Sequence, residues 1–342
     1  MPIRFATLAL LVLVACRGPE PEPDAGRAPD ARVMEGRRDA GPPRVDASFV
    51  RLPGDVSHPL DDVLRLNHLQ AEGTHNSYHL RPSETTIDDW NYEHAPLGEQ
   101  LATQGVRKVE LDVHWDAELQ RYRVYHVGLF DPRSTCDLLL DCLVELRVFS
   151  DAHPGHHPIF VQIEPKGSNE PLSPAELGDR LDAEIRAVFP EELLVTPDLV
   201  RAGMPTLAEA IATRGWPTLA EVRGRTLFFL DCARDYCVEY AGGTLEGRAA
   251  FVDSEPGDPF AAVAIINTPG DAVREAVEAG FVVRTRAVSM PEALHADAAA
   301  LQAELDAALA SGAHLISTDV PAPRDDIPFF VQIPGGTPSR CN

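Results

Sequence analysis

From about residue 60 to residue 320 the chain alternates short apolar runs with longer segments whose apolar positions recur every three or four residues. Short apolar runs between turn residues are typical of buried strands, and the wider spacing is typical of amphipathic helices. The pattern predicts strands at 67–73, 106–113, 122–125, 158–163, 225–230, 261–266, 281–285 and 314–317. It predicts helices at 96–104, 137–152, 173–188, 206–213, 218–222, 271–279 and 291–310.

Repeated strand-then-helix units indicate a parallel sheet, because each helix returns the chain to the same end of the sheet. Eight strands over about 260 residues suit a closed (β/α)8 TIM-type barrel, and an open doubly wound sheet is the alternative. The interval between the strands at 106–113 and 122–125 is too short for a crossover helix, so these two strands are expected to join by a turn. We therefore predict an α/β barrel that is irregular between its second and third strands.

The N-terminus is typical of a processing signal. Arg4 precedes an apolar run at 5–14 that is too short to span a bilayer. The run ends in Leu-Val-Ala-Cys16, which resembles a bacterial lipobox, where the cysteine carries the lipid. We expect residues 1–16 to be a lipoprotein signal peptide, and the exported protein to be anchored at a membrane surface of the cell envelope through Cys16. An ordinary signal peptide, with secretion, is the alternative.

Composition sets further bounds. Residues 17–48 are rich in Pro, Ala and charged residues and nearly lack large apolar ones, which predicts a disordered linker before a barrel domain at 49–342. The formal charge of −23 argues against nucleic acid, whose phosphates an acidic protein repels. Acidity suits a cation-dependent site, although solubility alone explains much of the surplus. We expect a monomer.

Six cysteines are present. Cys136 with Cys142 and Cys232 with Cys237 are close pairs in a chain expected to be exported, so two local disulfides are predicted, with zinc binding as the less favoured reading. If Cys16 carries lipid, Cys341 is left unpaired, or the pairing differs.

Four polar clusters close predicted strands. They read Thr-His75-Asn76-Ser-Tyr, Glu110-Leu-Asp112-Val-His114, Val-Tyr-His126 and Gln-Ile-Glu164-Pro-Lys166. Four further charged residues also stand at strand ends: Asp231, Arg284, Arg286 and Asp319. Because the active site of a (β/α)8 barrel lies at the carboxyl ends of its strands, these side chains are expected to share one mouth.

The carboxylates predict a metal site. Glu110 and Asp112 lie two residues apart and face the same side of a strand, where burial without a partner is expensive. A divalent cation relieves that cost, with Asn76 and Glu164 as further oxygen ligands; Ca²⁺ suits such hard ligands and Mg²⁺ is second. The alternative, an edge with its charges in water, fits the apolar neighbours less well.

The histidines predict proton transfer near neutral pH. His75 and His126 are the candidate acid/base pair, and Asp319, which follows the strand that neighbours the first in a closed barrel, is placed to orient His75. A polar turn cap at His75 and a structural role for His126 are the alternatives.

Basic side chains predict contacts with the substrate. Lys166 is a candidate for a phosphate oxygen, and Arg284 and Arg286, which share a face, for phosphate or inositol hydroxyls. The alternatives are a surface lysine and salt bridges at the barrel rim with Asp231 or Asp319.

From about residue 67 to residue 321, these segments resemble the phosphoinositide-specific phospholipase C superfamily, most of all its bacterial Ca²⁺-dependent branch. The resemblance implies a TIM-type barrel, His75 and His126 as the acid/base pair, and calcium. The Ca²⁺ ligands that it implies are Asn76, Glu110, Asp112 and Glu164. Asp231 departs from the eukaryotic pattern, which has a phosphate-binding lysine there, so unphosphorylated phosphatidylinositol is the expected substrate.

We therefore expect Ca²⁺-dependent cleavage of phosphatidylinositol, or a related inositol phosphodiester, to diacylglycerol and cyclic inositol phosphate. A glycerophosphodiesterase or an enzyme like sphingomyelinase D is the alternative on the same barrel. The His-Arg-Gly hallmark of the glycerophosphodiesterases is replaced here by His75-Asn76-Ser77. A non-catalytic Ca²⁺-dependent binding lipoprotein ranks third, because both histidines are present.

Overall fold

The computed structural model describes residues 58–167, 171–335 and 338–342. The signal peptide predicted at 1–16 with its lipid on Cys16, the linker at 17–48 and the expected start of the domain at residue 49 all lie outside these residues. Residues 61–342 form one compact unit. In the ranges that the structure describes, no helix is both long and apolar enough to cross a bilayer.

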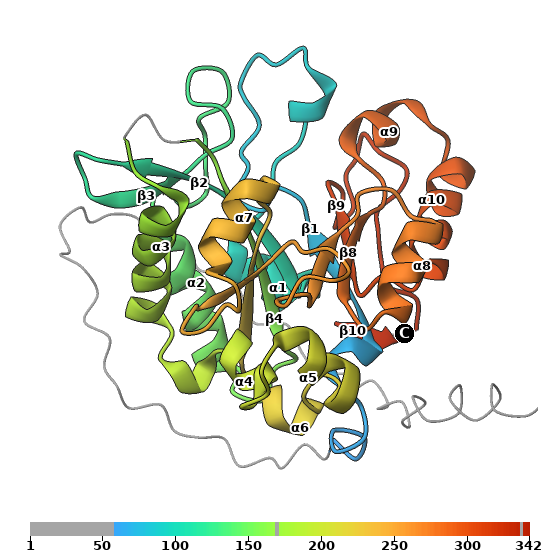
Figure 1. Ribbon diagram of the computed structural model, residues 1–342. Coiled ribbons are helices and arrows are strands. Elements are labelled where there is room, and N and C mark those ends of the chain that lie inside the picture. Colours follow the sequence, from blue (N-terminus) through green and yellow to red (C-terminus); the bar gives the residue numbers. More distant parts are fainter. Residues whose placement is uncertain (1–57, 168–170, 336–337) are drawn as a thin grey trace, which may run out of the picture. The chain divides into compact units, whose positions relative to one another are not determined.

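Eight parallel strands form the centre of this unit (Figure 1). They are β1 (Leu69–Thr74), β2 (Lys108–Asp116), β4 (Ile159–Pro165), β5 (Thr226–Leu230), β6 (Ala250–Val252), β7 (Val263–Ile265), β8 (Val282–Arg286) and β9 (Leu315–Thr318). The strands pair in the order β6-β5-β4-β2-β1-β9-β8-β7. A parallel bridge between Asp253 and Val263 joins the two ends of this series. The sheet is thus a nearly closed barrel, which confirms the predicted TIM-type fold over the open-sheet alternative.

Strand β3 (Arg121–Val124) corrects the predicted strand count. It pairs antiparallel with β2, Val124 opposite Val113, so the expected turn between these strands is confirmed. However, β3 lies off the main series of strands, and the eighth barrel strand is β6, which the sequence did not predict. A tenth strand, β10 (Ser339–Cys341), pairs antiparallel with the start of β1.

Helices surround the strands (Figure 1). They are α1 (Leu97–Thr103), α2 (Leu139–Ala152), α3 (Pro174–Val188), α4 (Pro197–Arg201), α5 (Leu207–Arg214), α6 (Leu219–Val222), α7 (Arg234–Ala241), α8 (Asp271–Glu278), α9 (Met290–His295) and α10 (Ala298–Ala310), with 3₁₀ turns at Leu66–His68, Asp88–Trp90 and Glu191–Leu193. The single helix predicted at 291–310 is wrong. The backbone is extended at Ala296 and Asp297, and the Asp297 carboxylate accepts hydrogen bonds from the first amides of α10, so a new helix begins there.

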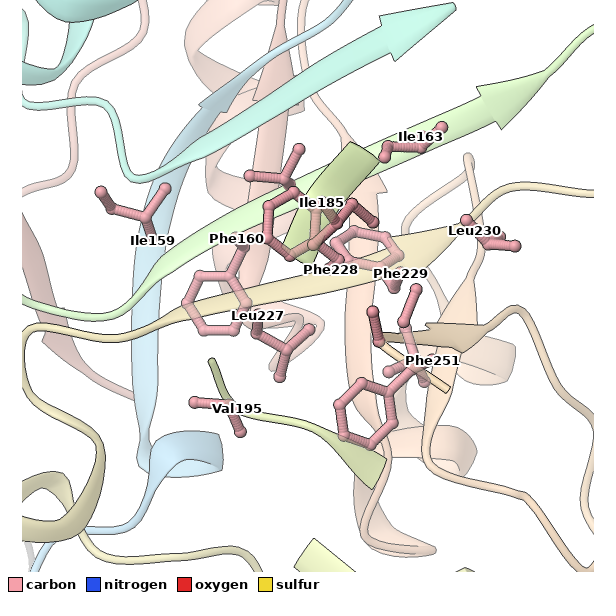
Figure 2. Close-up of a cluster of buried hydrophobic side chains, with 14 of the residues drawn as sticks. Ile159, Phe160, Ile163, Ile185, Val195, Leu227, Phe228, Phe229, Leu230 and Phe251 are labelled. Atoms are coloured by element: carbon pink, nitrogen blue, oxygen red, sulfur yellow. The ribbon is translucent and has the colours of Figure 1, made fainter. Parts of the chain in front are cut away.

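The core is built from strands that are buried on both faces, as expected for a parallel barrel. Every residue of β5 is buried, and its Phe228 and Phe229 pack with side chains of β4 and with Phe251 of β6 (Figure 2). Ile185 of α3 lies in the same cluster. Burying each such side chain contributes about 1.5–3 kcal/mol, so this packing holds the strand ends in position.

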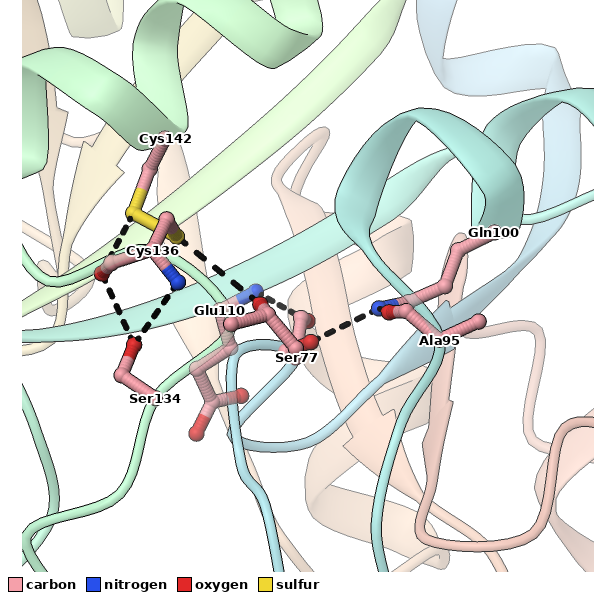
Figure 3. The surroundings of a disulfide bond; sticks show 8 residues. Ser77, Ala95, Gln100, Glu110, Ser134, Cys136 and Cys142 are labelled. Atoms are coloured by element: carbon pink, nitrogen blue, oxygen red, sulfur yellow. Dashed lines mark hydrogen bonds between the residues drawn. A yellow bond between two sulfur atoms is a disulfide. The ribbon is translucent and has the colours of Figure 1, made fainter. Parts of the chain in front are cut away.

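Both predicted disulfides are present. Cys136, which precedes α2, is bonded to Cys142 within α2, and their Cα atoms are 5.3 Å apart (Figure 3). Cys232, which follows β5, is bonded to Cys237 within α7, and their Cα atoms are 5.6 Å apart.

Candidate active site

The predicted site residues lie at the carboxyl ends of the strands. His75 and Asn76 follow β1, Glu110 and Asp112 are on β2, Glu164 is on β4 with Lys166 just beyond it, His126 follows β3, Arg284 and Arg286 are on β8, and Asp319 follows β9. The pairing register sets Asp112 opposite Glu164. Parallel pairing therefore gathers at one mouth residues that are up to about 240 positions apart in the chain.

The ring of His75 is held by hydrogen bonding at Nδ1 and has a carboxylate near Nε2. Nδ1 lies 2.8 Å from Asp319 Oδ1 and 3.1 Å from Arg286 Nη2, and Nε2 lies 3.6 Å from Glu110 Oε1. Burial opposes ionisation of Asp319, but His75, Arg286 and the Met290 amide outweigh it and keep its pKa below the ordinary value. Asp319 therefore lies within hydrogen-bonding distance of His75, where an orienting carboxylate is expected.

His126 has its own carboxylate, which the sequence did not predict. Its Nδ1 lies 2.9 Å from Asp131 Oδ2, and the same oxygen lies 2.8 Å from His79 Nε2. The hydrogen bond to Asp131 outweighs burial and raises the pKa of His126, with Asp112 adding to the effect. Asp131 itself is fully buried at the end of a tight loop, where it pairs with Val127. Each candidate histidine is therefore fixed at Nδ1 by an acidic side chain.

Glu110 lies in a buried network of cations. Lys108 Nζ contacts Glu110 Oε2, and Arg284 Nη2 lies 3.0 Å from the same oxygen. Although burial opposes the charged form, these two cations hold the pKa of Glu110 well below its usual range. Arg284 is almost fully buried and also contacts Asn267. Its main partner is thus Glu110, which neither of its two expected roles included, whereas Arg286 forms the rim ion pair expected with Asp319.

Lys108 was also missed by sequence reasoning. It is fully buried on β2, where its ammonium donates to Thr74 O at 3.1 Å and Ser317 Oγ at 3.0 Å, and burial lowers its pKa to about 7. Its position two residues before Glu110, on the same face of the strand, was the available signal. Gly73 on β1 leaves space for it, because a Cβ there would lie 2.6 Å from Lys108 Cδ.

Asp112 is buried, and neither of its carboxylate oxygens accepts a hydrogen bond. Lys166 Nζ lies 3.1 Å from Oδ2 as an ion pair without hydrogen-bond alignment, and it also contacts Glu164 Oε1. Burial, followed by the charge of Glu164, raises the pKa of Asp112 to about 7. A buried carboxylate left in this state is short of positive charge.

Across the described ranges, no group of three or more His, Cys, Asp or Glu side chains is close enough together to hold a metal ion as it stands. The donor set nevertheless fits a divalent cation. Two oxygens of Asp112 are unsatisfied, Glu164 is adjacent, and Asn76 is buried with a strained φ of 43°. Carboxylate and amide oxygens are the ligands that Ca²⁺ prefers.

Two further features surround these residues. Asp231, after β5, accepts a hydrogen bond of 2.8 Å from Gln162, and burial with nearby Glu110 raises its pKa. The loop directly after His126 carries exposed apolar side chains, since Leu129 is 89% and Phe130 68% exposed. The mouth is therefore acidic inside and apolar along one rim.

A family-level comparison agrees with this arrangement. The model of the family described as Ca²⁺-dependent phosphoinositide phospholipase C matches residues 64–123 and 118–342. A comparison with curated proteins found no match to this chain.

Solved structures share the fold. A Ca²⁺-dependent phosphoinositol-specific phospholipase C from a Pseudomonas species, in a myo-inositol complex, is 18% identical with a TM-score of 0.62, covering 83% of this chain and 97% of that one. A Ca²⁺-dependent phosphatidylinositol-specific phospholipase C from Streptomyces antibioticus is 22% identical with a TM-score of 0.57, covering 75% of this chain and 95% of that one. A phosphatidylinositol-specific phospholipase C from Staphylococcus aureus is 14% identical with a TM-score of 0.51, covering 79% of this chain and 92% of that one. At these identities the likeness establishes the common barrel.

Proposed function

This chain belongs to the Ca²⁺-dependent phosphoinositide phospholipase C family and is a phosphoric diester hydrolase, and we propose that it cleaves phosphatidylinositol or a related inositol phosphodiester. The observation that carries the proposal is the pair of histidines at the barrel mouth, each held at Nδ1 by a carboxylate. Such a pair leaves both Nε2 atoms for proton transfer on the two sides of a phosphorus atom.

His75 acts as the base and His126 as the acid. His75 takes the proton of the inositol 2-hydroxyl while Asp319 keeps its ring oriented and stabilises the imidazolium. The hydroxyl oxygen bonds to phosphorus, the bond from phosphorus to the glycerol oxygen breaks, and His126 protonates that oxygen. The products are a cyclic inositol phosphate and diacylglycerol. The raised pKa of His126 favours this assignment, because it keeps more of the ring protonated near neutral pH.

Asn76, Glu110, Asp112 and Glu164 are the residues that would hold Ca²⁺. When bound there, the ion supplies positive charge to the phosphate and lowers the pKa of the attacking hydroxyl. The unsatisfied oxygens of Asp112 support this ligand set. Mg²⁺ is less suitable, because it requires near-ideal octahedral geometry and keeps its waters.

The rim supports a lipid substrate presented at a membrane surface. Exposed Leu129 and Phe130 lie three and four residues after His126 in the chain and are suited to contact acyl chains or the bilayer interface. Asp231 would accept hydrogen bonds from inositol hydroxyls and repel a ring phosphate, which favours an unphosphorylated inositol ring. We further propose, from the lipobox, an exported lipoprotein anchored at Cys16, which metabolic labelling with palmitate and a Cys16→Ser variant would test. We also propose that the protein acts as a monomer.

Phosphorus NMR tests the proposal directly. Phosphatidylinositol is incubated with the protein in Ca²⁺ and then in excess chelator, with a His126→Ala variant as control. We expect a cyclic phosphodiester signal in Ca²⁺ only, and a rate about 10²–10⁴-fold lower in the variant. Cleavage of glycerophosphodiester or sphingolipid with phosphatidylinositol left intact would refute the inositol assignment.

A further inference from the structure

The chain contains only two lysines, and both lie at the candidate site. All but two of its 30 Lys and Arg residues are arginines; the two lysines are Lys108 and Lys166. Each contacts a carboxylate of the proposed Ca²⁺ ligand set. A lysine is a compact point charge on a flexible stem, unlike the planar arginine fork, so it can enter a space meant for an ion and leave it again.

The two lysines differ in their freedom to move. Lys108 is fully buried and fixed by Thr74, Glu110 and Ser317. Lys166 follows the end of β4, and its side chain is 26% exposed. Among the described residues, its ammonium forms ion pairs with the two facing carboxylates, Asp112 and Glu164. Lys166 thus has a route to solvent that Lys108 lacks.

The Lys166 ammonium also occupies the place where a metal ion would bind the two carboxylates. Asp112 and Glu164 are paired across β2 and β4, and Lys166 Nζ lies between their side chains. Both Asp112 oxygens remain without an aligned hydrogen-bond donor, so the ammonium neutralises this carboxylate without saturating it. A divalent cation that took these oxygens would meet the ammonium at the same place.

We propose that Lys166 is a tethered internal cation that competes with the divalent cation for Asp112 and Glu164. The inference rests on the ligand set in the proposed function. With the metal absent, the ammonium limits repulsion between the two carboxylates; when the metal is bound, Lys166 is released toward the mouth, where its charge is free for the anionic substrate. Because coupling between two ligands is reciprocal, an anion that draws Lys166 outward strengthens metal binding by the same factor.

Calorimetric titration of Ca²⁺ into the protein tests this competition. The variants are Lys166→Met, which keeps the length of the side chain without the charge, Lys166→Arg, which keeps the charge, and Arg274→Met as a control for loss of an exposed cation on α8. We expect about tenfold tighter binding in Lys166→Met, which corresponds to about 1.4 kcal/mol. Lys166→Arg keeps the positive charge and should therefore show none of this gain in affinity, and Arg274→Met should stay near the wild-type affinity.

Lysine labelled with ¹³C at Cε gives a second readout, because the chain supplies only two such signals. On addition of Ca²⁺ the Lys166 signal, assigned by its absence in Lys166→Arg, should move toward the position of a solvated lysine, while the Lys108 signal changes less. Equal affinities for wild type and Lys166→Met, with an unmoved Lys166 signal, would overturn the inference and leave the ligand set intact. If Ca²⁺ bound to neither protein, both the inference and the ligand set in the proposed function would fail.

Discussion

Gly73 is the position where a single added carbon should disturb the site most. It lies on β1 directly opposite Lys108 of β2, and a Cβ there would lie 2.6 Å from Lys108 Cδ, 2.8 Å from its Cβ and 3.1 Å from its carbonyl oxygen. Lys108 has no space to retreat, because it is fully buried and its ammonium is held by Thr74, Glu110 and Ser317. Gly73→Ala must therefore push β1 and β2 apart or expel Lys108 from Glu110.

Overpacking of this kind typically destabilises a protein by about 1–3 kcal/mol. For a unit of this size, about 2 kcal/mol lowers the midpoint of thermal unfolding by roughly 3–4 °C. Phosphodiesterase activity should fall as well, because Glu110 loses the cation that fixes it. Calorimetry and turnover of phosphatidylinositol measure the two effects, with Gly155→Ala as the matched control, since a Cβ at Gly155 meets no atom within 4 Å. A Gly73→Ala protein that melted and turned over like wild type would refute the tight β1–β2 contact.

Three further predictions concern the site itself. Asp131→Asn should move the alkaline limb of the pH–rate profile to lower pH, because the Asp131 carboxylate raises the pKa of His126. His126 must be protonated to act as the acid, so activity falls as the pH rises through this pKa. An unmoved limb would exclude His126 as the acid. Asp319→Asn should lower kcat/KM by about 10²–10⁴-fold, and an undiminished kcat/KM would contradict its orienting role. Leu129→Ser combined with Phe130→Ser should reduce turnover on phosphatidylinositol vesicles at least about tenfold while sparing a soluble short-chain substrate, whereas equal losses on both would point to a folding defect.

The barrel was predictable because its strands are buried on both faces and read as apolar runs. The errors have local causes. Strand β6 is only Ala250–Val252, too short to stand out as a run. In β3, Arg121 and Arg123 are exposed while Tyr122 and Val124 are buried, an alternation typical of an antiparallel strand with one face in water. That alternation was a signal that β3 lies outside the barrel.

The acidic and imidazole side chains of the candidate site were predictable because they close strands in short motifs. Their partners were harder to find, because pairing register and loop closure decide them. Lys108 lies inside an apolar strand. The residues that hold its ammonium are Thr74 on β1 and Ser317 on β9, the first and last strands of the barrel, which pair with each other. Asp131 reaches His126 only because the loop between them folds back at Val127. Neither the contacts of Lys108 with Thr74 and Ser317 nor that of Asp131 with His126 can be inferred from a sequence spacing.

The balance of charge at the barrel mouth supports the proposed need for a divalent cation. Apart from the ion pair of Asp319 with Arg286, four carboxylates face three cationic side chains: Glu110, Asp112, Glu164 and Asp231 against Lys108, Lys166 and Arg284. A phosphodiester adds one more negative charge, and two like charges about 4 Å apart repel by roughly 4 kcal/mol at an effective dielectric constant of about 20. The surplus is already visible in Asp112, whose pKa is raised to about 7 by burial and by Glu164. Two added positive charges would balance the carboxylates together with the substrate, whereas Lys166 alone cannot serve both. The acidic residues therefore match an enzyme that acquires its metal before or with its lipid.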